Sequence, residues 1–186
     1  QHVLEKQPVK EVVTILEFLE SGYVLLKEEL LPEILSFKFW GIDRIDIWNI
    51  ANIVRNGQYS DGDAGERLFR KITWLDAMQK YDNEKIREIA RFLITLIGEA
   101  KVLPLEYIID KIIGTKDWDN DDDYSDRVGD ETKDFVKVGN FVSPYKEYYF
   151  GKINFEKNKR EYLDFLFSLR SFIGALREFK KEDVLY

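Results

Sequence analysis

The side chains that most often carry enzymatic chemistry are scarce in this sequence. His2 is the only histidine, and none of the 186 residues is a cysteine. Within this sequence, a histidine-based triad, a two-histidine zinc motif and a cysteine nucleophile are therefore excluded. The lack of cysteine also excludes disulfides and is typical of a protein from a reducing cytoplasm.

One pair of glycines has the spacing found in nucleotide-binding loops. Gly57 and Gly62 match the two glycines of a phosphate-binding P-loop, but Asp63 and Ala64 follow them. A working loop needs a lysine there to contact the phosphates and a hydroxyl to bind magnesium. We interpret this stretch as a plain turn and expect no cofactor in this chain.

The acidic segment 117–131 is the strongest charge feature. Its acids outnumber its only base, Arg127, by the full net charge of −7, so the rest of the chain is neutral. Alternate residues from Asp117 to Ser125 match calcium-loop ligand positions, but Asp122 stands at the glycine position and Val128 at the final glutamate position. We predict a flexible acidic loop at about 117–133 without a metal. A neutral body lacks the broad positive field typical of proteins that bind nucleic acids mainly by charge.

Small basic clusters remain as candidate phosphate contacts. One comprises Lys152, Lys157, Lys159 and Arg160, at the start of the last expected helix, and another comprises Arg67, Arg70 and Lys71 on an earlier helix. Tyrosines 145, 148 and 149 and Phe150 lie beside Lys152 and could stack on bases. Aromatic residues at this spacing more often pack into a core, and both interpretations stay open.

The stretch 37–48 combines aromatic residues, a turn and a helix start. Gly41 permits a left-handed backbone. Asp43 is placed as an N-cap whose carboxylate accepts from the amides of residues 45 and 46. We expect a helix from about residue 44 to 55, and we expect Trp40 and Trp48 to be largely buried.

Helical spacing of apolar residues recurs along most of the chain. Pro8, Pro104 and the Ser143-Pro144 pair mark helix starts, Asp82 or Asn83 caps another helix, and Pro32 either kinks a helix or begins a short one. A stripe from Leu68 to Met78 predicts a fourth helix, residues 58–62 a loop and 154–180 a long final helix. Residues 135–142 are ambiguous, with a short extended piece as one alternative. No strand-like alternation is convincing, so we predict one compact all-α domain of seven or eight helices over 1–186.

The first residues of the sequence and its hydropathy bear on the cellular location of such a domain. The sequence has no signal peptide, and no apolar run approaches the ~20 residues that span a bilayer. We therefore expect a soluble, cytoplasmic protein without membrane contact, and the abrupt ends suggest a piece of a longer chain.

Three segments resemble subdomain 2B of UvrD-like superfamily 1 DNA helicases, a family that includes Rep and PcrA. Residues 4–19 are similar to the segment that enters 2B from subdomain 2A. The aromatic-Gly41-Ile42 turn, with the capped helix that carries Trp48, is similar to the middle of 2B. Residues 165–170 and 175–179 are similar to its last helix. The resemblance covers almost the full chain.

The resemblance implies an accessory role. The ATPase of this family lies between subdomains 1A and 2A, so ATP and magnesium belong to the parent chain and this fragment neither hydrolyses ATP nor unwinds DNA. The parent would be a 3′–5′ DNA helicase, with DNA repair as a typical setting. In it, 2B would swing as a rigid body and contact duplex or junction DNA weakly, neighbouring subdomains or other proteins.

The family also implies candidate DNA contacts. Its 2B subdomain has a Gly-Ile-Gly type turn whose amides approach duplex phosphates. The third position here is Asp43, whose carboxylate would occupy those amides and repel phosphate. The candidate DNA-binding residues are Gly41, Ile42, Arg44, Lys152, Lys157, Lys159 and Arg160.

A different class of function is the alternative. A free-standing helical module could bind a protein partner through an apolar groove. An inserted subdomain must enter and leave at one place, so residues near Val9 and Phe179 should then lie together, with the first and last helices in contact.

Overall fold

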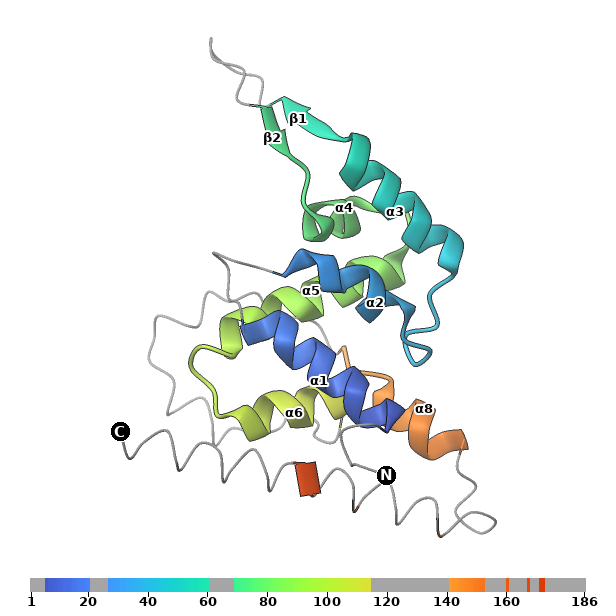
Figure 1. Ribbon diagram of the computed structural model, residues 1–186, viewed down its shortest axis with the longest axis vertical. Helices are drawn as coiled ribbons and strands as arrows, with labels where there is room; N and C mark the ends of the chain where they lie inside the picture. Colours follow the sequence, from blue (N-terminus) through green and yellow to red (C-terminus); the bar gives the residue numbers. More distant parts are fainter. Residues whose placement is uncertain are drawn as a thin grey trace.

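The computed structural model describes residues 6–20, 27–60, 69–114, 141–152, 160, 167 and 171–172 (Figure 1). The α-helices of this part are α1 (Gln7–Glu20), α2 (Leu31–Ser36), α3 (Arg44–Asn56), α4 (Trp74–Lys80), α5 (Glu84–Glu99), α6 (Leu105–Ile113) and α8 (Tyr145–Lys152). A 3₁₀ turn, η2 (Glu28–Leu30), precedes α2. The predicted all-α, compact single domain is confirmed.

Local sequence signals explain most of the helix ends. Thr73 and Asp76 form a capping box at the start of α4, and the side chain of Asn83 accepts from the amide of Lys85 at the start of α5. Pro32 lies in the first turn of α2, so it begins a short helix and does not kink a longer one. Gly114 ends α6 with φ +75°, in the left-handed region where glycine carries no steric cost.

A short antiparallel ribbon interrupts the helices. Strand β1 (Gln58–Ser60) pairs with β2 (Phe69–Lys71), with Tyr59 opposite Arg70. The predicted loop at 58–62 is therefore wrong for 58–60, and the helix predicted from Leu68 is wrong for 69–71. Gly57 ends α3 in an extended conformation, and the Thr73 cap prevents α4 from starting earlier. Three-residue strands are too short for a two-residue period to be recognised.

The core joins the helices along one continuous apolar cluster. Helix α5 contributes its largest part through Ile86, Ile89, Leu93 and Ile97, which are fully buried and recur at helical spacing. Helix α4 packs on α5, and α1 packs on α2 and α6. Figure 1 shows α3 and the β1–β2 ribbon at one end of the described part, with α6 and α8 toward the other. The ribbon and α3 thus form the outer end of the domain.

An aromatic cluster anchors the turn before α3. Trp40 is only 1% exposed; the centroid of its ring lies 4.5 Å from that of Phe39 and 6.1 Å from that of Phe92. Phe141 packs on both Trp40 and Phe92, and Tyr145 of α8 packs edge-on against Phe39. The prediction that Trp40 is buried is confirmed.

The matching prediction for Trp48 is wrong, because its side chain is 62% exposed. Helix α3 turns Ile50 fully into the core, with Ile47 and Val54 packed beside it. At about 100° per residue, Trp48 lies on nearly the opposite side of the helix from Ile50. The helical period was correct, but the stripe assigned to the core was not.

Other sequence predictions fall outside the described residues. These are the acidic loop 117–133, Lys157, Lys159, Arg67, residues 135–140 and the proximity of Val9 and Phe179. Within the expected last helix, Arg160, Phe167, Ser171 and Phe172 are helical, and Phe172 is buried. No helix in the described part of the chain is long and apolar enough to cross a membrane.

Alanine substitution should separate the two tryptophans. We expect Trp40→Ala to lower the free energy of unfolding by about 3–5 kcal/mol, because it empties a core aromatic site. Trp48→Ala should change it by only about 0.5 kcal/mol, as for an exposed position. Urea unfolding followed by circular dichroism measures both values. Equal losses of unfolding free energy for the two variants would contradict the burial of Trp40 and the exposure of Trp48.

Candidate functional site

The turn formed by residues 37–43 is the part of the predicted site that is anchored in the core. Its buried residues Phe37, Phe39 and Trp40 fix it to the core. The amide of Trp40 donates to the carbonyl of Phe37 at 3.1 Å, and that of Gly41 donates to Lys38 at 3.2 Å. Gly41 has φ +61°, so the predicted left-handed backbone is confirmed.

A second feature favours glycine at this position. A Cβ atom added to Gly41 would lie 3.1 Å from Nζ of Lys85, at the first turn of α5. The ammonium group of Lys85 therefore lies against the backbone of the turn. A side chain at position 41 would both strain the backbone and displace this cation.

The start of α3 leaves part of its backbone open. The carboxylate of Asp43 accepts from the amide of Ile45 at 3.1 Å, which confirms the predicted cap at that position. The amide of Asp46 donates to the backbone carbonyl of Asp43 and not to its carboxylate. No hydrogen bond joins the amides of Ile42, Asp43 or Arg44 to another described residue. These three consecutive N–H groups are available to an anion.

The neighbouring charges determine what such an anion would meet. Lys38, Arg44 and Lys85 are exposed around the turn, and Asp43 is the exposed acid among them. The charge of Lys38 also acts on the buried carboxyl of Glu11, where it opposes the rise in pKa that burial causes. Asp46 faces elsewhere: its carboxylate accepts from the hydroxyl of Tyr81 at 2.8 Å and from the amide of Asn83 at 3.1 Å. The local balance of exposed charge at the turn is therefore positive.

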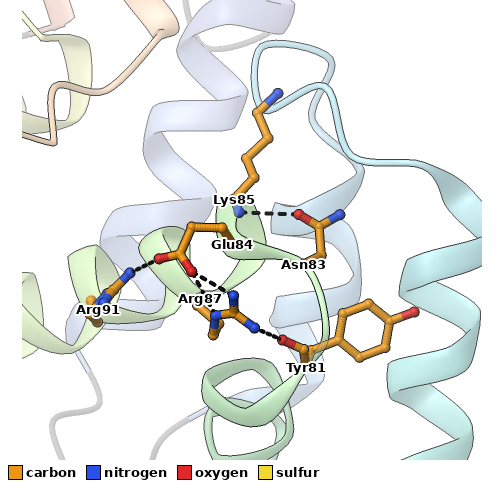
Figure 2. Close-up of polar contacts among 6 residues, drawn as sticks. All are labelled: Tyr81, Asn83, Glu84, Lys85, Arg87 and Arg91. Carbon is orange, nitrogen blue, oxygen red and sulfur yellow. Dashed lines mark hydrogen bonds and ion pairs between the residues drawn. The ribbon is translucent and has the colours of Figure 1, made fainter.

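Lys85 differs from the arginines that follow it on α5. Arg87 and Arg91 both donate to the carboxylate of Glu84, and Arg87 also donates to the carbonyl of Tyr81 at 2.7 Å (Figure 2). Bonds from Arg87 and then Arg91 hold the pKa of Glu84 below its usual value. Figure 2 shows the Lys85 side chain extending away from this group. Lys85 is thus the cation of this turn that points toward the site.

The structure brings together only part of the predicted site. Gly41 and Arg44 are exposed and Ile42 is half-buried, so these three residues lie together as predicted. Lys152 is the last residue of α8, which Figure 1 shows in a different part of the molecule from α3. Arg160 is exposed, and Lys157 and Lys159 lie outside the described residues. Of the second basic cluster, Arg70 and Lys71 lie on strand β2 and not on a helix.

Sequence reasoning missed two cations and one aromatic side chain at this site. Lys38 is inside the recognised turn, where its exposure depends on the burial of the aromatic residues on both sides. Lys85 reaches Gly41 from 44 positions further along the chain, and no sequence signal reports this contact. Trp48 was assigned to the wrong face of α3.

The tyrosines of α8 have a structural role. Tyr145 is fully buried and donates from its hydroxyl to the carbonyl of Pro8 at 2.9 Å. Tyr149 donates to the carboxylate of Glu11, which also accepts from the side-chain amide of Gln7 at 3.1 Å. Both tyrosines therefore tie α8 to α1, which favours the core interpretation over base stacking.

Glu11 is the one strongly buried carboxyl group that the structure describes, with 3% exposure. Burial raises its pKa, and the bonds from Tyr149 and Gln7 oppose this effect. Burial also raises the pKa of Tyr145 and Tyr149. Since Glu11 lies inside the α1–α8 contact, where its carboxyl accepts from Tyr149 and Gln7, we assign it to stability.

Comparison with known proteins adds no constraint. Among the described residues, no group of three or more His, Cys, Asp or Glu side chains could hold a metal ion. No protein-family model, curated protein or solved structure matches this chain. The resemblance to helicase subdomain 2B therefore stays a prediction.

The raised pKa of Glu11 gives a pH dependence with a definite sign. Its folded-state pKa lies above the unfolded value, so its contribution to stability is present below the unfolded pKa and is lost as pH rises through the folded pKa. Glu11→Gln keeps a hydrogen-bond acceptor without the charge. We expect the stability of this variant, relative to wild type, to increase between pH 4.5 and pH 7.5.

Urea unfolding at the two pH values tests this expectation. Glu17→Gln, at an exposed position of the same helix, is the matched control and should show a smaller change in relative stability. A difference between Glu11→Gln and wild type that is independent of pH would contradict the assignment.

Proposed function

We propose that this chain is an accessory, 2B-like subdomain of an ATP-dependent 3′–5′ DNA helicase. The observation that carries the proposal is the turn at residues 37–43, where the amides of Ile42, Asp43 and Arg44 bond to no described residue and Lys38, Arg44 and Lys85 are exposed. In this proposal the turn and the start of α3 contact the phosphates of duplex DNA.

The physical basis is the chemistry of a helix N-terminus. Free amides and the positive end of the helix dipole attract phosphate, and three nearby cations strengthen this attraction. Asp43 opposes it, because its carboxylate caps α3 beside the same amides. The acidic segment 117–131 adds long-range repulsion. Contact with DNA should therefore be weak.

A weak contact suits a subdomain that is tethered to a larger enzyme. The proposal assigns ATP and magnesium to the parent chain and gives this chain neighbouring helicase subdomains as partners. Tethering raises the effective concentration of a linked site to about millimolar, so a weak site can still bias the position of the subdomain. A cytoplasmic location and a role in DNA repair belong to the same proposal.

A second candidate function has its own observation. Ile45, Trp48 and Ile53 of α3 are exposed. Tryptophan and arginine are enriched among the residues that dominate protein–protein binding. A free-standing protein-interaction module would use this surface without contacting DNA.

Binding to a labelled blunt duplex tests the main proposal. We expect a dissociation constant of about 10⁻⁴ M or weaker near physiological salt. The affinity should fall as the salt concentration rises, because phosphate contacts release counterions. The triple variant Lys38→Gln, Arg44→Gln, Lys85→Gln should weaken binding further and flatten the salt dependence. Fluorescence anisotropy at two salt concentrations measures both effects.

A charge-matched variant controls for net charge. The triple variant Lys10→Gln, Lys101→Gln, Lys146→Gln also removes three exposed cations, from α1, the segment after α5 and α8, and should leave most of the binding intact. Equal losses for both variants would show that binding depends only on overall charge. A chain that binds no duplex even at low salt would favour the protein-interaction module.

The opposing role of Asp43 gives an independent prediction. Asp43→Asn keeps an oxygen that can cap α3 and removes the negative charge, so stability should change little. Duplex affinity should rise about fivefold, as expected for removing roughly 1 kcal/mol of charge repulsion in water. Glu33→Gln, at an exposed position of α2, is the control, and the same anisotropy assay applies. No gain in affinity would place the phosphates away from this turn.

A further inference from the structure

The outward side of α3 carries a continuous stripe of side chains. At about 100° per residue, six positions fall on this side of the helix. Ile45 is 56% exposed and Trp48 is 62% exposed; the other members are at least partly exposed. The stripe, called here the α3 stripe, consists of Arg44, Ile45, Trp48, Asn52, Arg55 and Asn56.

The stripe contains no acidic residue, although acids outnumber bases in this chain. The single acid within α3 is Asp46, and its carboxylate is bound to Tyr81 and Asn83. Cations therefore lie at both ends of an apolar platform, and carboxamide groups lie between and beyond them. Arginine fits phosphate in a bidentate manner, and a carboxamide offers both a donor and an acceptor.

The rotation of α3 that exposes this stripe is fixed. Ile50 is fully buried on the opposite side. Asn49 donates to the hydroxyl of Tyr81 at 3.2 Å, and Tyr81 donates to Asp46 at 2.8 Å. These bonds join α3 to the segment between α4 and α5, so the exposure of Trp48 is a property of the packed fold.

We infer that the α3 stripe binds an unpaired stretch of DNA strand, with one base stacked on the indole of Trp48 and phosphates on Arg44 and Arg55. This inference rests on the proposed function and specifies its DNA substrate. Every base has a π-face, so a tryptophan flanked by cations accepts a single strand of any sequence. Arg44 and Arg55 are separated by about 16 Å along the helix axis. A strand must therefore run along α3 to reach both.

The chemistry of the stripe favours a nucleic acid over a protein. Its apolar part is limited to Ile45 and Trp48, whereas a stable protein interface buries about 800 Å² on each partner. Its charge is of one sign, which complements a polyanion. A duplex keeps its base faces stacked inside the helix, so stacking on Trp48 requires an unpaired base.

The position of the stripe specifies the kind of DNA. Arg44 and Ile45 follow directly on the turn that is proposed to contact duplex phosphates. A duplex at the turn and an unpaired strand along α3 would then meet where the two strands separate. The preferred substrate is a fork, with a single-stranded arm beside a duplex.

Three labelled DNAs of equal length test the inference with the whole chain: a blunt duplex, a fork and a single strand. In anisotropy titrations at low salt, the fork should bind about tenfold more tightly than the blunt duplex, which is the effect of stacking about one base. Trp48→Ala should remove this preference without changing blunt-duplex affinity, and Trp48→Phe should retain most of it. Ile53→Ala, an exposed apolar change on another side of α3, is the control and should alter neither.

Tryptophan emission gives a second readout. Oligothymidylate should quench the emission of wild type more strongly than that of Trp48→Phe. Because Trp40, Trp74 and Trp118 emit in both proteins, the difference between the two reports stacking on Trp48. Arg55→Gln should weaken single-strand binding and leave blunt-duplex binding intact.

The failures of the two proposals are distinguishable. Duplex binding that depends on Lys85, with no preference for a fork and no effect of Trp48→Ala, would overturn the inference and leave the proposed function standing. No binding to any of the three DNAs would overturn both. Self-association in sedimentation that Trp48→Ala abolishes, without any preference for the fork, would assign the stripe to a protein interface.

Discussion

Burial of Trp40 is the constraint on which the geometry of the candidate site depends. The turn that carries Gly41 and Asp43 has little regular hydrogen bonding of its own, and three buried aromatic residues hold it in place. Trp40 packs against Phe92 of α5 and against Phe141, so the turn is joined to the centre of the fold. Its indole nitrogen is buried and has no partner among the described residues, a cost of about 1–3 kcal/mol that favourable packing must offset.

This anchored segment also sets the direction of α3. Because Gly41 has a left-handed backbone, the chain reverses beside α5 and brings Lys85 against the turn. The Asp43 cap then starts α3 at a fixed residue, and the bonds of Asp46 fix its rotation. Both the open amides and the exposed Trp48 follow from this sequence of constraints. A substitution at Trp40 would therefore change the geometry of the turn and of α3, although Trp40 itself would not contact a ligand.

The parts of this structure that the sequence predicted are those that depend on near neighbours. The caps share one local pattern: a side-chain oxygen accepts from the backbone amide two residues further along. They are Asp43, Asn83 and Ser143. The face of α3 that enters the core could not be predicted in the same way. Ile50 and Trp48 are both apolar and both lie on helical stripes, and the positions of α2 and α4, which pack on α3, decide between them. The contact between Gly41 and Lys85 depends on tertiary packing for the same reason.

Hydrogen bonds and ion pairs among the charged side chains limit the surface that could bind a polyanion. Glu84 forms ion pairs with Arg87 and Arg91, so these two arginines already have a carboxylate partner. The carboxylate of Asp46 accepts from the neutral donors Tyr81 and Asn83 and forms no ion pair with a described cation. The positive character of the turn thus comes from the fold, which gathers Lys38, Arg44 and Lys85 around Asp43, and this is how a chain of net charge −7 can present a cationic site.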